Sequence, residues 1–109
     1  MKNTFLAALA LAVTVATGFS QTTEESSVRP RDGFVPNAET AVKIGEAVLI
    51  PVYGEKQIDS ERPFTANLHG DIWIVTGTLN CGAPRCDGGT AIVKISKASG
   101  QILFMMHYK

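Results

Sequence analysis

The sequence lacks an excess of charge of either sign, and it lacks any cluster of Lys and Arg. It contains 10 Lys and Arg and 10 Asp and Glu, so the formal net charge is zero. Nucleic acids and anionic membranes are bound through basic patches that neutralise phosphates. The composition therefore argues against a nucleic-acid partner and against electrostatic attachment to an anionic membrane.

Long apolar runs are missing too, except for a short one near the start. Residues 5–16 are uncharged and mostly apolar, and they follow Lys2. This stretch has about a dozen residues, whereas a membrane-spanning helix needs about 20. A charged start, an apolar stretch and then small residues are typical of a secretory signal peptide, and a retained membrane anchor is the alternative. We predict a signal peptide at residues 1–20, cleaved after Ser20 or alternatively after Gly18.

The segment after the signal peptide, residues 21–33, has no apolar period. Such a polar segment buries too little surface to offset its ordering entropy, so we predict a flexible leader. Residues 34–109 are too few for two domains and should form a single domain. The protein should be exported to the periplasm or the extracellular space, and it should not be an integral membrane protein once the signal is removed.

A helix is predicted from Asn37 onward. Asn37 is a good N-cap, and Glu39 lies in the first turn, where the helix dipole favours a carboxylate. Apolar residues then recur at steps of three and four up to Val52. Pro51 removes a backbone donor and clashes with the preceding turn, so we expect the helix to kink or stop near Leu49 or Ile50. Residues 55–63 are charged and are predicted to form a loop.

From Phe64 the apolar period changes to two, which indicates strands. We predict four of them, over residues 64–69, 72–79, 89–96 and 101–107, with a tight turn at Gly70-Asp71. Trp73 and Val75 should share one face of the second strand. One helix followed by a meander of strands argues for an α+β domain whose sheet packs one face on the helix.

Cysteine is scarce, with Cys81 and Cys86 the only two, separated by four residues. In an exported chain two nearby thiols usually pair, so we predict a disulfide between them. A redox-active pair is less favoured because the two-residue spacing of thioredoxin-like sites is missing. Zinc is weaker still, because two cysteines do not complete a tetrahedral set. We therefore expect neither a metal nor a cofactor.

No catalytic motif is present. His69 and His107 are the only histidines, and neither has a metal-ligand spacing, so both are predicted to be surface residues of strands. Glu61, Arg62, Asp71 and Asp87 fall in turns and loops, where charged side chains are usually solvated. An enzyme would need a buried titratable pair, which the sequence does not indicate.

The large aromatic residues have two possible roles. Trp73, Tyr53 and Phe64 could anchor an interface, but their places at the helix end and in strands favour packing in the core.

Eight short motifs, from Asn37 to the last residue, carry a resemblance to a known family. They are NAETA at 37–41, EAVLIPVYGE at 46–55, ERPF at 61–64, WIVTGTL at 73–79, GGTA at 88–91, ISK at 95–97, GQIL at 100–103 and HYK at 107–109. In this order they resemble the bacterial immunity proteins of polymorphic toxin systems that have a nuclear transport factor two-like fold. Tyr108 departs from the family's closing His-Gly-Lys motif.

The resemblance implies a reduced version of this fold: one long N-terminal helix packed on a curved four-stranded antiparallel sheet, close to a cystatin-like arrangement. It also implies a non-catalytic, exported protein that binds and neutralises a cognate toxin. The contact surface should include the loop closed by Cys81 and Cys86, with Arg85 and Asp87, together with exposed strand residues. The alternative is a small-molecule or envelope-associated binding domain, with a pocket between helix and sheet lined by Trp73, Val75 and Met105.

Overall fold

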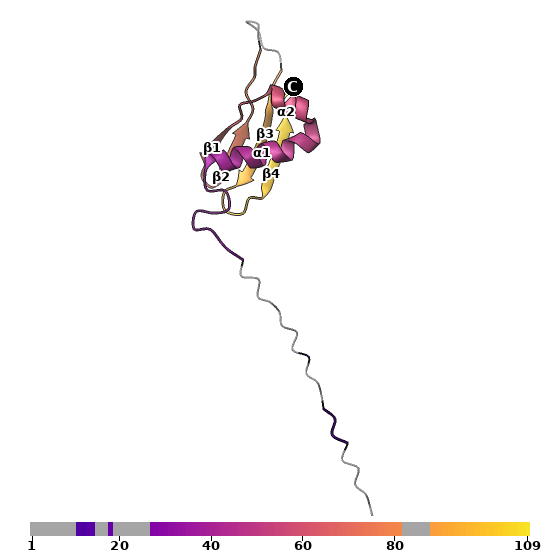
Figure 1. Cartoon of the computed structure of the whole chain (residues 1–109). Coiled ribbons are helices and arrows are strands. Elements are labelled where there is room, and N and C mark those ends of the chain that lie inside the picture. Colours follow the sequence, from indigo (N-terminus) through magenta and orange to yellow (C-terminus); the bar gives the residue numbers. More distant parts are fainter. Residues whose placement is uncertain (1–10, 15–17, 19–26, 82–87) are drawn as a thin grey trace, which may run out of the picture.

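The computed structural model describes residues 11–14, 18, 27–81 and 88–109 (Figure 1). Two helices, α1 (Ala38–Tyr53) and α2 (Glu55–Ser60), precede four strands, β1 (Thr65–His69), β2 (Ile72–Thr76), β3 (Ala91–Ser96) and β4 (Ile102–His107). The strands form one antiparallel sheet in the order β1-β2-β3-β4, which confirms the predicted α+β meander. The boundaries of the signal peptide, the leader and the domain stay predictions, as does the curvature of the sheet.

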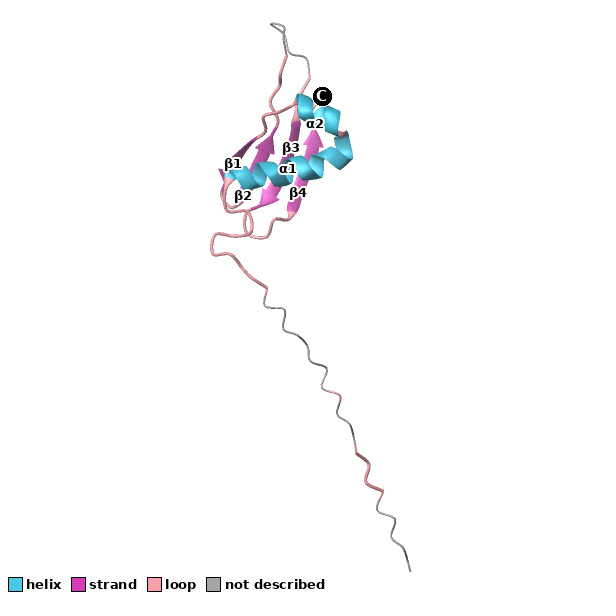
Figure 2. Ribbon diagram, in the orientation of Figure 1, coloured by secondary structure: helices cyan, strands magenta, loops and turns pink. Residues whose placement is uncertain are grey.

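Helix α1 starts where the sequence indicates. The backbone N–H of Thr40 donates to Oδ1 of Asn37 at 2.8 Å, which satisfies one of the unpaired donors of the first turn. Ala41, Gly45 and Leu49 are buried at steps of four, so a single face of the 16-residue helix turns toward the sheet. The helix crosses one side of the sheet in the ribbon view (Figure 2).

Of the predicted kink or stop near Leu49 or Ile50, the stop is wrong, because the helix continues through Pro51 to Tyr53; the kink stays a prediction. Pro51 is exposed, and on the solvent side of a helix carbonyls can tilt outward and make room for a proline ring. The helix ends when Gly54, with φ of 90°, donates its N–H to the carbonyl of Ile50 at 2.8 Å.

The predicted loop over residues 55–63 is also wrong in part, because residues 55–60 form helix α2. Ile58 is fully buried and belongs to the same hydrophobic cluster as Leu49 of α1. Ile58 is the one apolar residue among the polar and charged residues of α2, so the sequence shows no apolar period there. The burial of Ile58 in the core explains why these residues form a helix.

Strand pairing defines an inner face of the sheet, turned toward α1. Val75 pairs with Val93 and then Met105, and Trp73 pairs with Ile95 and then Ile102. Val75, Val93 and Ile95 are fully buried. The tight turn at Gly70-Asp71 is confirmed, since His69 pairs with Ile72 and Gly70 has φ of 63°.

The opposite side of the sheet is its outer face. Both described helices contribute to the hydrophobic cluster on the inner side, so the described part of the chain leaves the outer face without a helix. Residues of the outer face alternate with the inward ones in β1, β2 and β3, whereas a register shift between β3 and β4 interrupts the alternation between Ile102 and Phe104. The outer-face residues are Thr65, Asn67, His69, Ile72, Ile74, Thr76, Ile92, Lys94, Ser96, Phe104 and Met106.

The aromatic residues occupy the core largely as predicted. Trp73 and Phe64 are 7% and 5% exposed, and Tyr53 is half-buried against the same cluster. The indole N–H of Trp73 donates to the carbonyl of Val35 at 2.8 Å, so β2 holds the chain that leads into α1. Leu68 pairs with Trp73 on the inner face but is 43% exposed, because β1 lies at the edge of the sheet. None of the described helices is long and apolar enough to cross a membrane.

Candidate functional site

Glu61 is a buried carboxylate, contrary to the prediction that it is a solvated loop residue. It directly follows α2 and is only 4% exposed. Its Oε1 accepts the backbone N–H of Ala91 at 2.6 Å, and its Oε2 accepts the side-chain amide N–H of Gln57 at 3.0 Å. A buried charge costs several kcal/mol of desolvation unless it is hydrogen-bonded. These donors supply that compensation.

His107 meets the same carboxylate, so its prediction as a surface residue is also wrong. The side chain is 24% exposed, and Nε2 lies 3.1 Å from Oε2 of Glu61. Nδ1 lies 2.7 Å from the carbonyl oxygen of Tyr108, which can only accept, so Nδ1 carries a hydrogen. The ring also packs on Tyr53, with the ring centroids 5.4 Å apart. His69, by contrast, is exposed as predicted.

We call Gln57, Glu61, Ala91 and His107 the Glu61 cluster. Each oxygen of the Glu61 carboxylate and each ring nitrogen of His107 already has a protein partner. A general acid or base needs an atom within hydrogen-bonding reach of the substrate. The cluster is therefore arranged to hold the fold together. Across the described residues, no three His, Cys, Asp or Glu side chains are placed to share a metal ion.

The Glu61 cluster fastens both ends of the connection between β2 and β3. At one end, the N–H of Thr78 donates to the main-chain carbonyl of Glu61 at 2.7 Å. At the other end, Ala91 donates to the Glu61 side chain, and its carbonyl accepts the N–H of Gly77 at 3.1 Å. The segment leaving β2 and the segment entering β3 are thus joined to each other and to the end of α2.

Asn80 extends this attachment further along the connection. Its side-chain amide donates to the carbonyls of Ser60 and Arg62, at 3.2 and 2.7 Å. Two backbone carbonyls of the turn after α2 are satisfied in this way. We call the two ends of this connection, residues 77–80 and 88–91, the base of the loop. Side chains hold this base as well as the hydrogen bonds of the sheet.

A pocket of about 490 Å³, with polar and apolar walls, lies beside this base. It is formed by the end of α2, the two ends of the loop and the last residues of the chain: Gln57, Ser60, Glu61, Thr78, Leu79, Asn80, Gly88, Gly89, His107, Tyr108 and Lys109. Tyr108 packs tightly on Gly89, where an added Cβ would lie 2.2 Å from the Cβ of Tyr108. Glycine at position 89 leaves the space that Tyr108 occupies.

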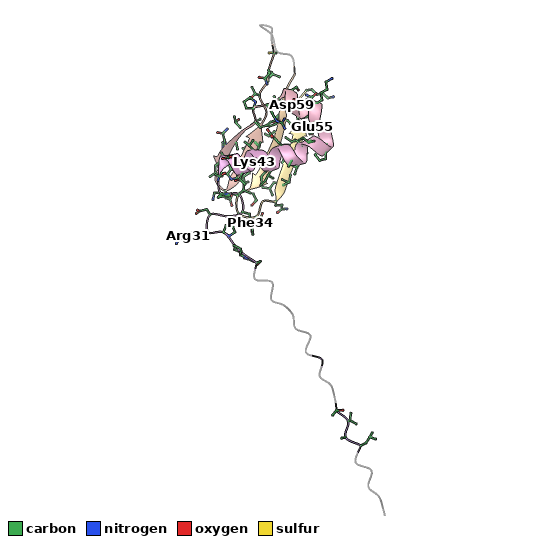
Figure 3. All side chains as sticks on the ribbon, in the orientation of Figure 1. Arg31, Phe34, Lys43, Glu55 and Asp59 are labelled. Atoms are coloured by element: carbon green, nitrogen blue, oxygen red, sulfur yellow. The ribbon has the colours of Figure 1, made fainter. Side chains whose placement is uncertain are left out.

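Arg62 joins the two helices next to this site. Its guanidinium donates to Glu46 of α1 at 3.2 Å and to Asp59 of α2, which is labelled in Figure 3. These hydrogen bonds, to Glu46 first and to Asp59 second, raise the pKa of Arg62 above its ordinary value. Arg62 therefore stays charged, and it helps to position the turn that carries Glu61.

Most of the residues predicted to contact a partner lie outside the part of the chain that the structure describes. Cys86, Arg85 and Asp87 lie outside the described residues, whereas Cys81 is described at the end of the segment that Asn80 fastens. The disulfide between Cys81 and Cys86 and the roles of Arg85 and Asp87 therefore stay predictions. The structure describes the base from which that loop extends.

Sequence reasoning missed Glu61 and His107, although one of them leaves a signal. The alternation of β4 puts His107 on the same side as Met105, two residues earlier, and Met105 pairs with buried Val93. Its inward position could thus have been predicted. Glu61 leaves no comparable signal, because it lies outside any periodic segment.

The alternative pocket with a lining of Trp73, Val75 and Met105 is not supported by the packing, although a cavity of about 570 Å³ lies between α1 and the edge strand β1. Trp73 and Val75 are buried in the hydrophobic cluster, and Met105 packs against it. A Cβ added at Gly45 of α1 would lie 2.8 Å from Cγ1 of Val75. Helix and sheet are therefore in direct contact where that pocket was expected.

A family model described as NTF2 fold immunity protein matches residues 40–109. The match includes most of α1, all of α2 and the whole sheet. The chain therefore belongs to the NTF2 fold immunity protein family, as its motifs suggest. No curated protein and no solved structure matches the chain.

Proposed function

We propose that this protein is an exported immunity protein that binds and neutralises a cognate bacterial toxin without catalysing a reaction. Membership of the immunity family carries the proposal. The Glu61 cluster supports the non-catalytic part, because its carboxylate oxygens and ring nitrogens serve the fold. Inhibition by binding needs only a stable surface that covers the toxin.

The anchored loop is the first part of that surface. Contact residues on loops bind best when a rigid scaffold positions them. Glu61 and Asn80 supply such a scaffold on the side of α2. A disulfide between Cys81 and Cys86 would further restrict the loop that carries Arg85 and Asp87, so that little ordering entropy is lost on binding.

Export is part of the proposal. A toxin that enters from a neighbouring cell meets the envelope first, and a signal peptide at residues 1–20 would place the inhibitor in the periplasm or outside the cell. The same location would allow the two thiols to oxidise.

Sequencing of the neighbouring genes identifies the candidate toxin, and binding to that toxin tests the function. The full exported chain should form a complex with the purified toxin domain and abolish its activity at equimolar ratio. Cells that express the chain should survive the toxin, whereas cells that express it without residues 1–20 should not survive a toxin delivered to the periplasm. A chain that neither binds the toxin nor protects would contradict the proposal.

A separate experiment tests whether the loop with Arg85 and Asp87 contacts the toxin. Replacing both Arg85 and Asp87 by Ala should weaken toxin binding about 10-fold or more, in the range of interface residues that contribute to affinity, and leave the melting temperature nearly unchanged. The matched control replaces Glu39 and Lys43, an exposed acidic and basic pair on α1. Equal affinity of both double variants would remove the loop from the contact surface.

A further inference from the structure

The outer face of the sheet is unusually apolar for a face without a helix. An antiparallel sheet with one solvated face normally alternates apolar inward and polar outward residues. Here the outward positions include Ile72 and Ile74 of β2, Ile92 of β3, and Phe104 and Met106 of β4. Phe104 is 41% exposed, Ile72, Ile74 and Met106 are half-buried, and Ile92 is buried. Apolar side chains gathered on a sheet face that partly reaches solvent mark interaction surfaces.

Lys94 is the one formally charged side chain among the outer-face residues of the strands. It stands in the row that joins Ile74 of β2 to Phe104 of β4, with the row of Ile92 and Met106 beside it. Its ammonium lies 5.2 Å from the centre of the Phe104 ring. Over the described stretches of the chain, no carboxylate forms an ion pair with Lys94. The cation is thus held within an apolar surface and lacks an anionic partner there.

The rim of the outer face is polar and neutral on the β1 side and at the end of β3, whereas its other side is the edge strand β4 with apolar Phe104 and Met106. Thr65 and Asn67 on the edge strand β1, and Ser96 at the end of β3, flank the apolar rows. An apolar centre with a polar rim is the usual anatomy of a protein–protein interface. The outer face therefore has the composition expected of a docking surface with one cationic position near its centre.

A second copy of the same chain does not complement this surface. Symmetric packing of two copies through the centre of the outer face would bring the two Lys94 side chains together. No Asp or Glu belongs to the outer face, so neither copy could supply a carboxylate from it. Like charges opposed in an apolar contact cost several kcal/mol, which disfavours this dimer.

We propose that the outer face of the sheet docks the toxin, through an apolar toxin surface that presents a carboxylate to Lys94. This inference rests on the proposed function and names the surface and the chemistry of the partner. Desolvation of the ion pair in an apolar contact would make Lys94 and Phe104 the main determinants of affinity.

Charge reversal tests the proposal, with the purified domain of the toxin identified in the binding test above as the probe and titration calorimetry as the measurement. Lys94→Glu should weaken binding about 100-fold and Phe104→Ala about 10-fold. Lys43→Glu is the matched control, because Lys43 lies on α1, on the helix side of the molecule (Figure 3), and its side chain is 75% exposed. It should leave the affinity unchanged.

Three further measurements make the result decisive. Melting temperatures check that each variant is folded, and Lys94→Gln replaces Lys94→Glu if the reversed charge unfolds the sheet. Replacing the opposing toxin carboxylate by Lys should restore binding to Lys94→Glu. Sedimentation of the chain alone should show a monomer.

The outcomes separate this inference from the function on which it rests. If the unaltered chain binds the toxin and both outer-face variants bind equally well, the docking surface is wrong and the immunity function stands. If the unaltered chain does not bind the toxin, both are overturned. A dimer that Lys94→Glu dissociates would also overturn the inference, because a second copy would then occupy the face.

Discussion

Glu61 holds together parts of the chain that are far apart in sequence. Its side chain reaches Ala91, 30 residues later, and His107, 46 residues later, while its main-chain carbonyl holds Thr78. Such a buried network is stable only while all its members are satisfied. Loss of the carboxylate would leave the buried N–H of Ala91 without its acceptor.

We therefore expect Glu61→Ala to lower the free energy of unfolding by about 2–4 kcal/mol, measured by urea denaturation. Glu61→Gln should cost less, because its amide oxygen can still accept from Ala91. Glu39→Gln is the control, since Glu39 forms an exposed ion pair that should contribute little. Equal stability of Glu61→Ala and Glu39→Gln would show that the Glu61 cluster does not support the fold.

At the scale of elements, contact between α1 and β2 depends on Gly45. No side chain separates the helix backbone from Val75 at this position. Glycine lowers the intrinsic stability of a helix, so its presence inside α1 needs a reason in the packing. The close approach to Val75 is that reason.

Gly45→Ala should destabilise the protein although alanine favours helix formation. The gain in helix propensity is about 1 kcal/mol, whereas forcing a methyl group into this contact costs about 1–3 kcal/mol. Adding Val75→Ala would provide room, so the double variant should lose less stability than the sum of the two single losses. Chemical denaturation of the four proteins measures this coupling, and strict additivity would contradict the contact.

For the whole molecule, the main question is how much its stability depends on the predicted disulfide. The inner face of the sheet packs on α1 through fully buried residues, including Leu49, Val75 and Val93. The Glu61 cluster separately fastens the ends of the loop. The core therefore does not require a cross-link within the loop.

Reduction of the native protein should lower its thermal stability by about 2 kcal/mol, or about 10 °C, without loss of secondary structure in circular dichroism. A variant with Cys81→Ser and Cys86→Ser should melt at the lower temperature with or without reductant. Free thiols in freshly isolated protein would refute the disulfide. An intact residue 1 in the same material, found by mass measurement, would refute signal cleavage.

The local pattern of the chain was enough to predict most of the elements. The N-cap at Asn37, the turn at Gly70 and the alternation of Trp73 and Val75 depend on near neighbours and on backbone sterics, so they can be read from short windows. Helix α2 and the passage of α1 through Pro51 could not be predicted in this way. Both depend on surroundings: Ile58 is buried against the core, and Pro51 faces solvent.

The sequence by itself determined the α+β class, the order of the strands and, through its motifs, the immunity family. Only the tertiary structure decided that Glu61 and His107 form a partly buried pair and that Ile74, Lys94 and Phe104 share one outward row. The physical reason is distance along the chain. Propensity and period act within a few residues, whereas these contacts join segments that approach one another only once the sheet has formed.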